Sequence, residues 1–170
     1  MPHRIGQRAS ALIEEIQTRF HEGHRRALPE LLAMAAAVEA RGIAENVVEA
    51  VKLMGDALEL HMFKEEMRLF PMMEQGGNSL IGQLIEDLHR EHVEHDHTML
   101  SLRARLASLR KLHGSDPALV TLVLAVERLA DELTQHIRTE DDVLFPLFLR
   151  PGLRACTPSP AHAGSNETND

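Results

Sequence analysis

The sequence has no tryptophan, no tyrosine, five phenylalanines and a single cysteine, Cys156. Without tyrosine the protein cannot carry a tyrosyl radical, and one thiol excludes an internal disulfide and a thiolate metal site. Strands prefer β-branched and aromatic residues, whereas the chain is rich in Ala, Leu, Glu, Arg and Met, which favour helices. The composition therefore predicts an all-α protein.

Long apolar runs and basic clusters are also missing. No stretch approaches the roughly 18 apolar residues that a membrane-spanning helix needs, and residues 1–6 lack the apolar run of a signal peptide. Together with the lone thiol, this predicts a cytoplasmic protein without membrane association. The net charge of -8, with no basic cluster to offset it, argues against nucleic-acid binding.

One pattern is present twice: a His, a Glu four residues later, and a Leu-Phe-Pro sequence that ends ten residues after the His. The two copies are His61, Glu65 and residues 69–71, and His136, Glu140 and residues 144–146. On a helix, positions i and i+4 share a face, so each copy directs an imidazole and a carboxylate to the same point. The identical spacing and ending favour metal ligation over coincidence.

Helix-breaking residues divide the chain into four long helical segments, at about residues 6–41, 44–74, 80–112 and 116–149. Four helices with short connections predict an antiparallel up-down-up-down four-helix bundle. Residues 1–149 are expected to form this single domain. Residues 150–170, which are rich in Pro, Ser and Gly, are expected to be a disordered tail.

Residues near the helix midpoints of such a bundle lie in one layer. Within about three residues of the midpoints, roughly 5 Å along a helix axis, the sequence places His21, His61, His95 and His136. With Glu65 and Glu140 they form the predicted metal site. His92 is the open alternative on the third helix, because it lies three residues before His95, and His89 and His97 compete less well. His24 is expected to be a surface neighbour of His21.

Imidazole and carboxylate ligands suit iron, manganese or zinc, whereas calcium and magnesium require more oxygen ligands. Four imidazoles and two carboxylates satisfy two ions better than one. If Glu65 and Glu140 each bridge, every ion receives two nitrogens and two oxygens. An oxo or hydroxo bridge and an open position then remain for a small ligand.

Four stretches of the chain, in order, resemble the hemerythrin-like domain of the bacterial repair-of-iron-centres family; they are residues 19–25 with 28–31, 61–71, 94–96 and 136–146. The resemblance implies a non-haem di-iron centre, and its expected ligands are His21, His61, Glu65, His95, His136 and Glu140. It also implies a role in nitrosative and oxidative stress, with NO or O₂ as small ligands and damaged iron–sulfur proteins as partners.

Oxygen-carrying hemerythrins differ from this pattern on the third and fourth helices. They have His-x-x-x-His on the third helix, which is missing here, and an Asp five residues after the last His. Asp141 occupies that position and is a rival of Glu140. Two functions therefore stay open: handling NO or supplying iron for cluster repair, and carrying or sensing O₂ or NO without turnover.

Overall fold

The computed structural model describes residues 2–114 and 116–149. All regular structure in these two ranges is helical, which confirms the prediction of an all-α protein. The tail predicted for residues 150–170 lies outside the described residues. No helix within the described ranges combines the length and the apolar character needed to cross a membrane.

The helices join end to end into four continuous segments. The first contains α1 (Pro2–Glu15), the π-helical η1 (Ile16–His21) and α2 (Glu22–Ala40), and the second contains α3 (Val47–Lys64), the π-helical η2 (Glu65–Leu69) and α4 (Phe70–Glu74). The third is α5 (Ile81–His113) alone. The fourth contains α6 (Pro117–Arg138), the π-helical η3 (Thr139–Leu144) and the 3₁₀ turn η4 (Phe145–Leu147).

The segments end where the sequence offers residues that stop a helix. Gly42 and Gly114 follow the first and third segments with φ of 67° and 61°, a backbone conformation that glycine adopts without a steric penalty. α6 begins at Pro117, and the side chain of Asp116 accepts hydrogen bonds from the amides of Ala118 and Leu119 at 2.9 and 3.3 Å.

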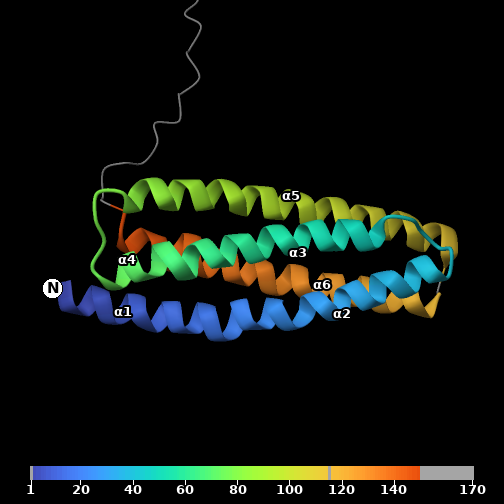
Figure 1. Ribbon diagram of the computed structural model, residues 1–170, viewed down its shortest axis with the longest axis horizontal. Coiled ribbons are helices and arrows are strands. Elements are labelled where there is room, and N and C mark those ends of the chain that lie inside the picture. Colours follow the sequence, from blue (N-terminus) through green and yellow to red (C-terminus); the bar gives the residue numbers. More distant parts are fainter. Residues whose placement is uncertain (1, 115, 150–170) are drawn as a thin grey trace, which may run out of the picture.

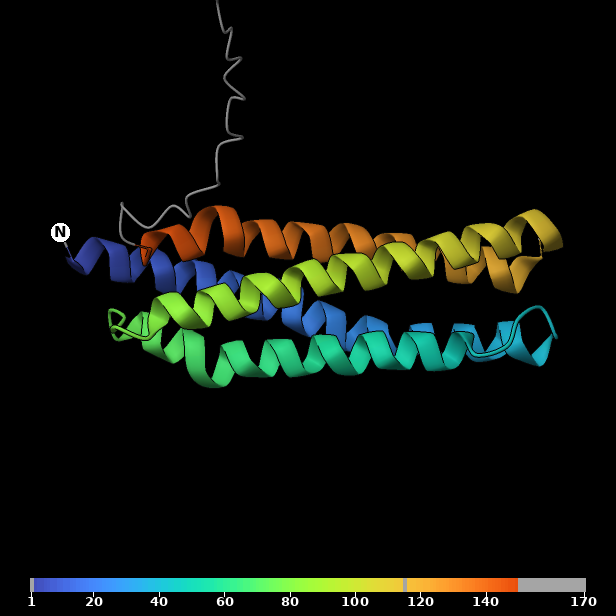
Figure 2. The ribbon, with the colours of Figure 1, turned by 90° about the horizontal axis from the view of Figure 1, so that it is seen from above.

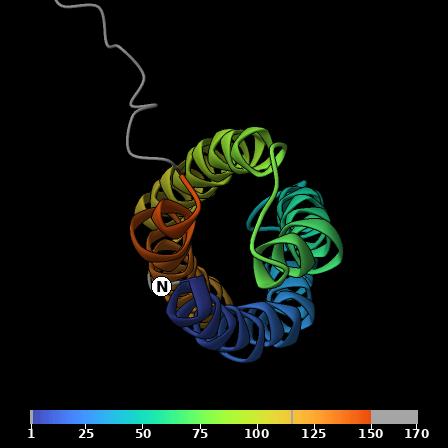
Figure 3. The same cartoon turned by 90° about the vertical axis from the view of Figure 1, so that its left-hand side faces the viewer.

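The four segments lie side by side, and the chain reverses direction at each connection (Figure 1). The same alignment is seen from above (Figure 2), and the view from the end that carries α4 shows the segments around a common interior (Figure 3). Buried side chains from all four segments fill this interior.

In the part of the chain that the structure describes, the interior contains two apolar clusters. The larger cluster joins buried side chains of α2, α3, α5 and α6, such as Leu31, Leu58, Met99 and Leu133. The smaller cluster joins side chains near the other end, such as Phe20, Phe70, Ile85 and Phe145. Along every segment the buried polar residues lie where one cluster gives way to the other: His21, His24, His61, Glu65, His92, His95, His136 and Glu140. A polar layer therefore crosses the middle of an otherwise apolar core.

The π-helical turns explain why residues spaced four apart along the chain are all buried on one side of their segment. On an α-helix, each step of four residues drifts by about 40° around the axis. His61, Glu65 and Leu69 follow this spacing and are all buried, and η2 lies within it. Its wider turns, with more residues per turn, offset the drift. η3 does the same after His136, so the repeated motif coincides with a repeated backbone irregularity.

Candidate metal centre

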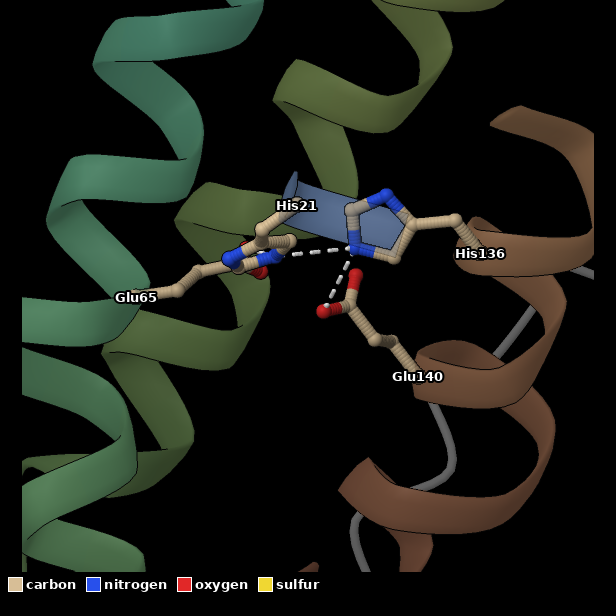
Figure 4. Close-up of side chains that lie close together, drawn as sticks. All are labelled: His21, Glu65, His136 and Glu140. Carbon is tan, nitrogen blue, oxygen red and sulfur yellow. Dashed lines mark hydrogen bonds and ion pairs between the residues drawn. The ribbon is translucent and has the colours of Figure 1, made fainter. Parts of the chain in front are cut away.

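Among the described residues, the polar layer contains two groups of side chains whose ligand atoms lie within 4.8 Å of one another. One group is His21, Glu65, His136 and Glu140 (Figure 4), and the other is His61, Glu65, His92 and Glu140. All of these residues are buried. Each group takes two imidazoles and two carboxylates, and both carboxylates belong to both groups.

The two oxygens of each shared carboxylate face different groups. In Glu65, Oε2 lies 3.3 Å from Nε2 of His21, while Oε1 lies 3.4 Å from Nε2 of His61. In Glu140, Oε1 lies 3.1 Å from Nε2 of His136, while Oε2 lies 3.2 Å from Nε2 of His92. This division of oxygens is the arrangement that a carboxylate needs in order to bridge two ions.

The imidazoles direct Nε2 toward the groups and use Nδ1 for an outer partner. The Nε2 atoms of His21 and His136 are 3.2 Å apart, and those of His61 and His92 are 3.1 Å apart. The outer contacts of Nδ1 are His21 to Glu66 at 2.7 Å, His61 to Glu91 at 3.0 Å, His92 to Asp141 at 2.9 Å, and His136 to Nε2 of His24 at 3.2 Å. Such outer hydrogen bonds fix the ring orientation and leave Nε2 free for a metal.

The Leu-Phe-Pro ending of each motif supplies an aromatic support for a histidine on the preceding segment. The ring of Phe70 stacks on His21 with centroids 5.8 Å apart, and the ring of Phe145 stacks on His92 at 6.0 Å. The residue after each shared glutamate adds the outer hydrogen bond to the same histidine, from Glu66 and Asp141 respectively. The full repeat is therefore longer than the His-x-x-x-Glu pair that marks it in the sequence.

Sequence reasoning missed these outer acids, although a signal for them was present. An acidic residue directly follows the glutamate in both copies, as Glu65-Glu66 and Glu140-Asp141. Asp141, the predicted rival of Glu140, lies outside both groups and contacts Nδ1 of His92 and Nε2 of His89, the latter at 3.1 Å.

The structure brings together five of the six predicted ligands and places His92 where His95 was expected. His95 is buried and its ring centroid lies 4.9 Å from that of His61. Among the described residues, however, it belongs to neither group and its Nε2 has no hydrogen-bond partner. The four segments differ in length, so the layer does not pass through every midpoint. An error of one helical turn on α5 is enough to exchange the two histidines.

His24 was expected at the surface, and this expectation is wrong. Its side chain is buried, and its Nε2 lies 3.2 Å from Nδ1 of His136. It also lines a cavity of about 390 Å³ between α2 and α6, together with Phe20, Leu31 and Leu129. The sequence signal was its spacing of three from His21, which places both histidines on one helix face.

Burial determines the charge of most of these histidines. It lowers the pKa of His21, and it lowers the pKa of His24 and His61 to about 3 and that of His95 to about 4. Burial also acts against the charged form of His92, but the hydrogen bond to Asp141 and the nearby carboxylate of Glu140 outweigh it and raise its pKa to about 9. Neutral imidazole is the form that binds metal.

The two shared carboxylates have opposite electrostatic environments. Burial and then the neighbouring Glu140 raise the pKa of Glu65 well above its usual value. Burial also disfavours the charged form of Glu140, but His136 and His92 outweigh it and hold the pKa of Glu140 well below its usual value. Two carboxylates in one buried layer repel each other when both are ionised, and bound cations remove that repulsion.

Unsatisfied oxygen atoms show that the site fits a metal. Both carboxylate oxygens of Glu65 and Oε2 of Glu140 are buried, and within residues 2–114 and 116–149 they have no hydrogen-bond partner. The histidine nitrogens at 3.2–3.4 Å from them are not aligned for hydrogen bonding. A buried carboxylate without hydrogen bonds is costly. Metal ions at the two groups would satisfy these oxygens, and the nitrogen and oxygen donors suit iron, manganese or zinc.

The pH dependence of the metal-free protein follows from these shifts. His24, His61 and His95 are neutral in the folded protein but bind protons in the unfolded chain below about pH 6.5. Stability should therefore fall as the pH decreases from about 6.5 toward 4. His92 acts in the opposite direction, because its raised pKa gives stability below about pH 6.5 that is lost as the pH rises through about 9. Urea midpoints of chelator-treated protein between pH 4.5 and 9.5 should pass through a maximum near neutral pH. A urea midpoint that rises steadily as the pH decreases would contradict the conclusion that His24, His61 and His95 are neutral in the folded protein.

The fold and the site define a class of helical protein with a buried histidine–carboxylate centre. The model of the hemerythrin HHE cation-binding domain matches residues 12–148, and the chain belongs to this family. The iron-sulfur cluster repair protein DnrN of Neisseria gonorrhoeae is 32% identical over 142 residues, which cover 82% of this chain and 90% of that protein. These comparisons confirm the resemblance to iron-centre repair proteins.

Two further relatives are longer than this chain. The iron-sulfur cluster repair protein YtfE of Cronobacter sakazakii is 30% identical over 143 residues, and YtfE of Dickeya chrysanthemi is 31% identical over 144 residues. The two matches cover 81% and 82% of this chain, respectively, and 65% of each relative. The chain therefore spans about two thirds of the length of these YtfE proteins.

Proposed function

We propose that this protein is an antiparallel up-down-up-down four-helix bundle that holds two non-haem iron ions and supplies iron for the repair of damaged iron–sulfur clusters. The observation that carries the proposal is the pair of ligand groups that share Glu65 and Glu140. The names of the relatives, which are iron-sulfur cluster repair proteins, support the choice of iron and of the repair role. We place this activity in the cytoplasm, during nitrosative and oxidative stress.

Six residues would hold the iron in this proposal. His21 and His136 serve one ion, His61 and His92 serve the other, and Glu65 and Glu140 serve both, which replaces His95 by His92 in the predicted set. Iron bound at these positions would be redox-active and would bind small ligands. Each ion would receive two nitrogens and two oxygens from the chain, which would leave positions for NO, O₂ or an acceptor that withdraws the iron.

The surrounding residues keep the iron sites assembled when iron leaves. Glu66, Glu91 and Asp141 hold the outer nitrogens of three of the imidazoles, and His24 holds the fourth. Burial keeps His21 and His61 neutral at pH 7, so their Nε2 atoms are ready to bind again. A site that persists without metal is suited to repeated loading and delivery.

The test is a transfer experiment with labelled iron. Protein loaded without oxygen with ⁵⁷Fe(II) should carry two irons per chain, one for each ligand group. Mixing it with a dehydratase whose [4Fe–4S] cluster has been damaged by NO should restore dehydratase activity and move ⁵⁷Fe into the cluster. The Glu140→Ala variant, treated in the same way, is the control for free iron. One iron per chain, or zinc alone after loading with ample iron, would contradict the two-ion site.

A second function is favoured by the apolar surroundings of the layer. Leu58 and Leu133 of the larger cluster lie one turn from His61 and His136 on the same segments. Such surroundings accept small uncharged molecules, so the protein could instead carry or sense O₂ or NO without turnover. A carrier should form a long-lived O₂ complex and retain its iron against a chelator. A repair protein should lose its iron to the chelator and to the damaged cluster.

A further inference from the structure

The two carboxylates lie on one side of the histidine layer. Glu65 follows His61 and Glu140 follows His136 by four residues, or about 6 Å along a helix axis. In both segments this direction leads to the smaller apolar cluster, which contains Phe70 and Phe145. The ends of these segments, at α4 and at the end of the fourth segment, lie at the same end of the molecule (Figure 1). The carboxylates therefore cover the side of the layer that faces the smaller cluster.

His95 lies on the opposite side of the histidine layer, toward the larger apolar cluster. α5 runs in the opposite direction, because it passes Ile85 of the smaller cluster before His92 and reaches Met99 of the larger cluster afterwards. His95 follows His92 by three residues, or about 4.5 Å toward the larger cluster. Its ring stands edge-on to His61, with centroids 4.9 Å apart and planes 81° apart.

The surroundings of His95 leave its inner nitrogen unexplained. The residue is 7% exposed, and its Nε2 is buried with no hydrogen-bond partner in the part of the chain that the structure describes. On that side the layer borders the larger apolar cluster, whose members include Leu58, Leu133 and Met99. Buried polar atoms in native proteins normally have a partner. The partner of this nitrogen is therefore expected to be a molecule that the protein binds.

We propose that His95 positions a small exogenous ligand of the metal centre, with its Nε2–H donating a hydrogen bond to that ligand. The ligand class is a diatomic molecule or a small linear anion, such as O₂, NO or azide, bound on the side of the layer that the carboxylates leave open. This inference rests on the proposed two-ion centre. His95 itself contacts the ligand and is not a metal ligand, in agreement with its position outside both groups.

Azide binding to the iron-loaded protein tests the proposal. His95→Leu removes the donor and keeps an apolar side chain of similar size, while His95→Gln keeps an N–H donor. Azide should bind about 3–10-fold more weakly to His95→Leu than to the wild type, the usual range for one hydrogen bond, and His95→Gln should recover most of this loss. The azide vibration should shift in D₂O in the wild type and not in His95→Leu. His97→Leu, an exposed neighbour on α5, is the matched control.

Measurements of thermal stability and iron content, taken with the azide affinity, distinguish the inference from its alternatives. In the metal-free protein, His95→Leu should leave the thermal midpoint unchanged or raised, because the nitrogen it removes has no partner; a clear decrease would indicate a structural role and overturn the inference. Iron content reduced to one per chain would make His95 a metal ligand, which also overturns it. Unchanged azide affinity at full iron content would refute the ligand contact alone, whereas a wild type without paired iron would refute the proposed function.

Discussion

Replacing Glu140 with alanine is expected to remove both ions from the protein rather than one. The two oxygens of Glu140 face different ligand groups, with Oε1 near His136 and Oε2 near His92. Each group would lose one of its four ligands at the same time. Since even changes in outer residues cost about 10–100-fold in metal affinity, each ion should bind at least about 100-fold more weakly. Metal analysis after gel filtration should find little iron.

Matched variants separate this effect from a general loss of structure. Glu65→Ala should behave like Glu140→Ala, because its oxygens are divided in the same way. Asp142→Ala lies on the same segment but is exposed, and should retain the iron of the wild type. Glu66→Ala should fall between them, because Glu66 supports His21 without belonging to either group. One iron retained in Glu140→Ala would show that Glu140 serves only one ion.

Replacing His92 with alanine is expected to remove one ion and leave the other. His92 belongs only to the group that contains His61, whereas His21, His136 and both carboxylates still form the complete first group. The iron content should fall to about half, with a loss of affinity of at least 10–100-fold at the affected position. Mössbauer spectra should change from those of a coupled pair to those of an isolated ion.

His95→Ala and His97→Ala are the controls on the same helix. His97 is exposed, and His95 is buried but outside both groups. Both variants should retain two irons per chain, one for each ligand group. If His95→Ala loses an iron and His92→Ala does not, the assignment reached from the sequence is correct and the position of α5 relative to its neighbours must be shifted by one turn.

The sequence predicted the helical segments well because their ends are marked by local chemistry. Gly42, Gly76 and Gly114 stop helices, and Asp116 with Pro117 starts one. The repeated motif was equally readable, since the i, i+4 geometry belongs to a single helix and requires no knowledge of the others. Both features depend on residues that are close together in the chain.

The choice between His92 and His95 could not be made from residues that are close together in the chain. Both histidines are buried on the same face of α5, and only the axial position of α5 against α3 and α6 decides which one joins His61. That position depends on packing along the whole bundle and on the wider turns η2 and η3. The contacts of Glu91 with His61 and of His24 with His136 could not be predicted for the same reason, because each joins two different segments.

The shared carboxylates have a mechanical consequence for the chain. The first two segments form one hairpin and the last two form another, and each ligand group takes two residues from each hairpin. Each ion would thus cross-link the two hairpins. When iron departs, the apolar clusters and the His61–Glu91 and His136–His24 contacts still join the hairpins, but the metal cross-link in the polar layer is lost. An acceptor that draws iron from the layer would therefore also remove a link between the two hairpins, and the outer contacts alone would then keep the ligand groups in place.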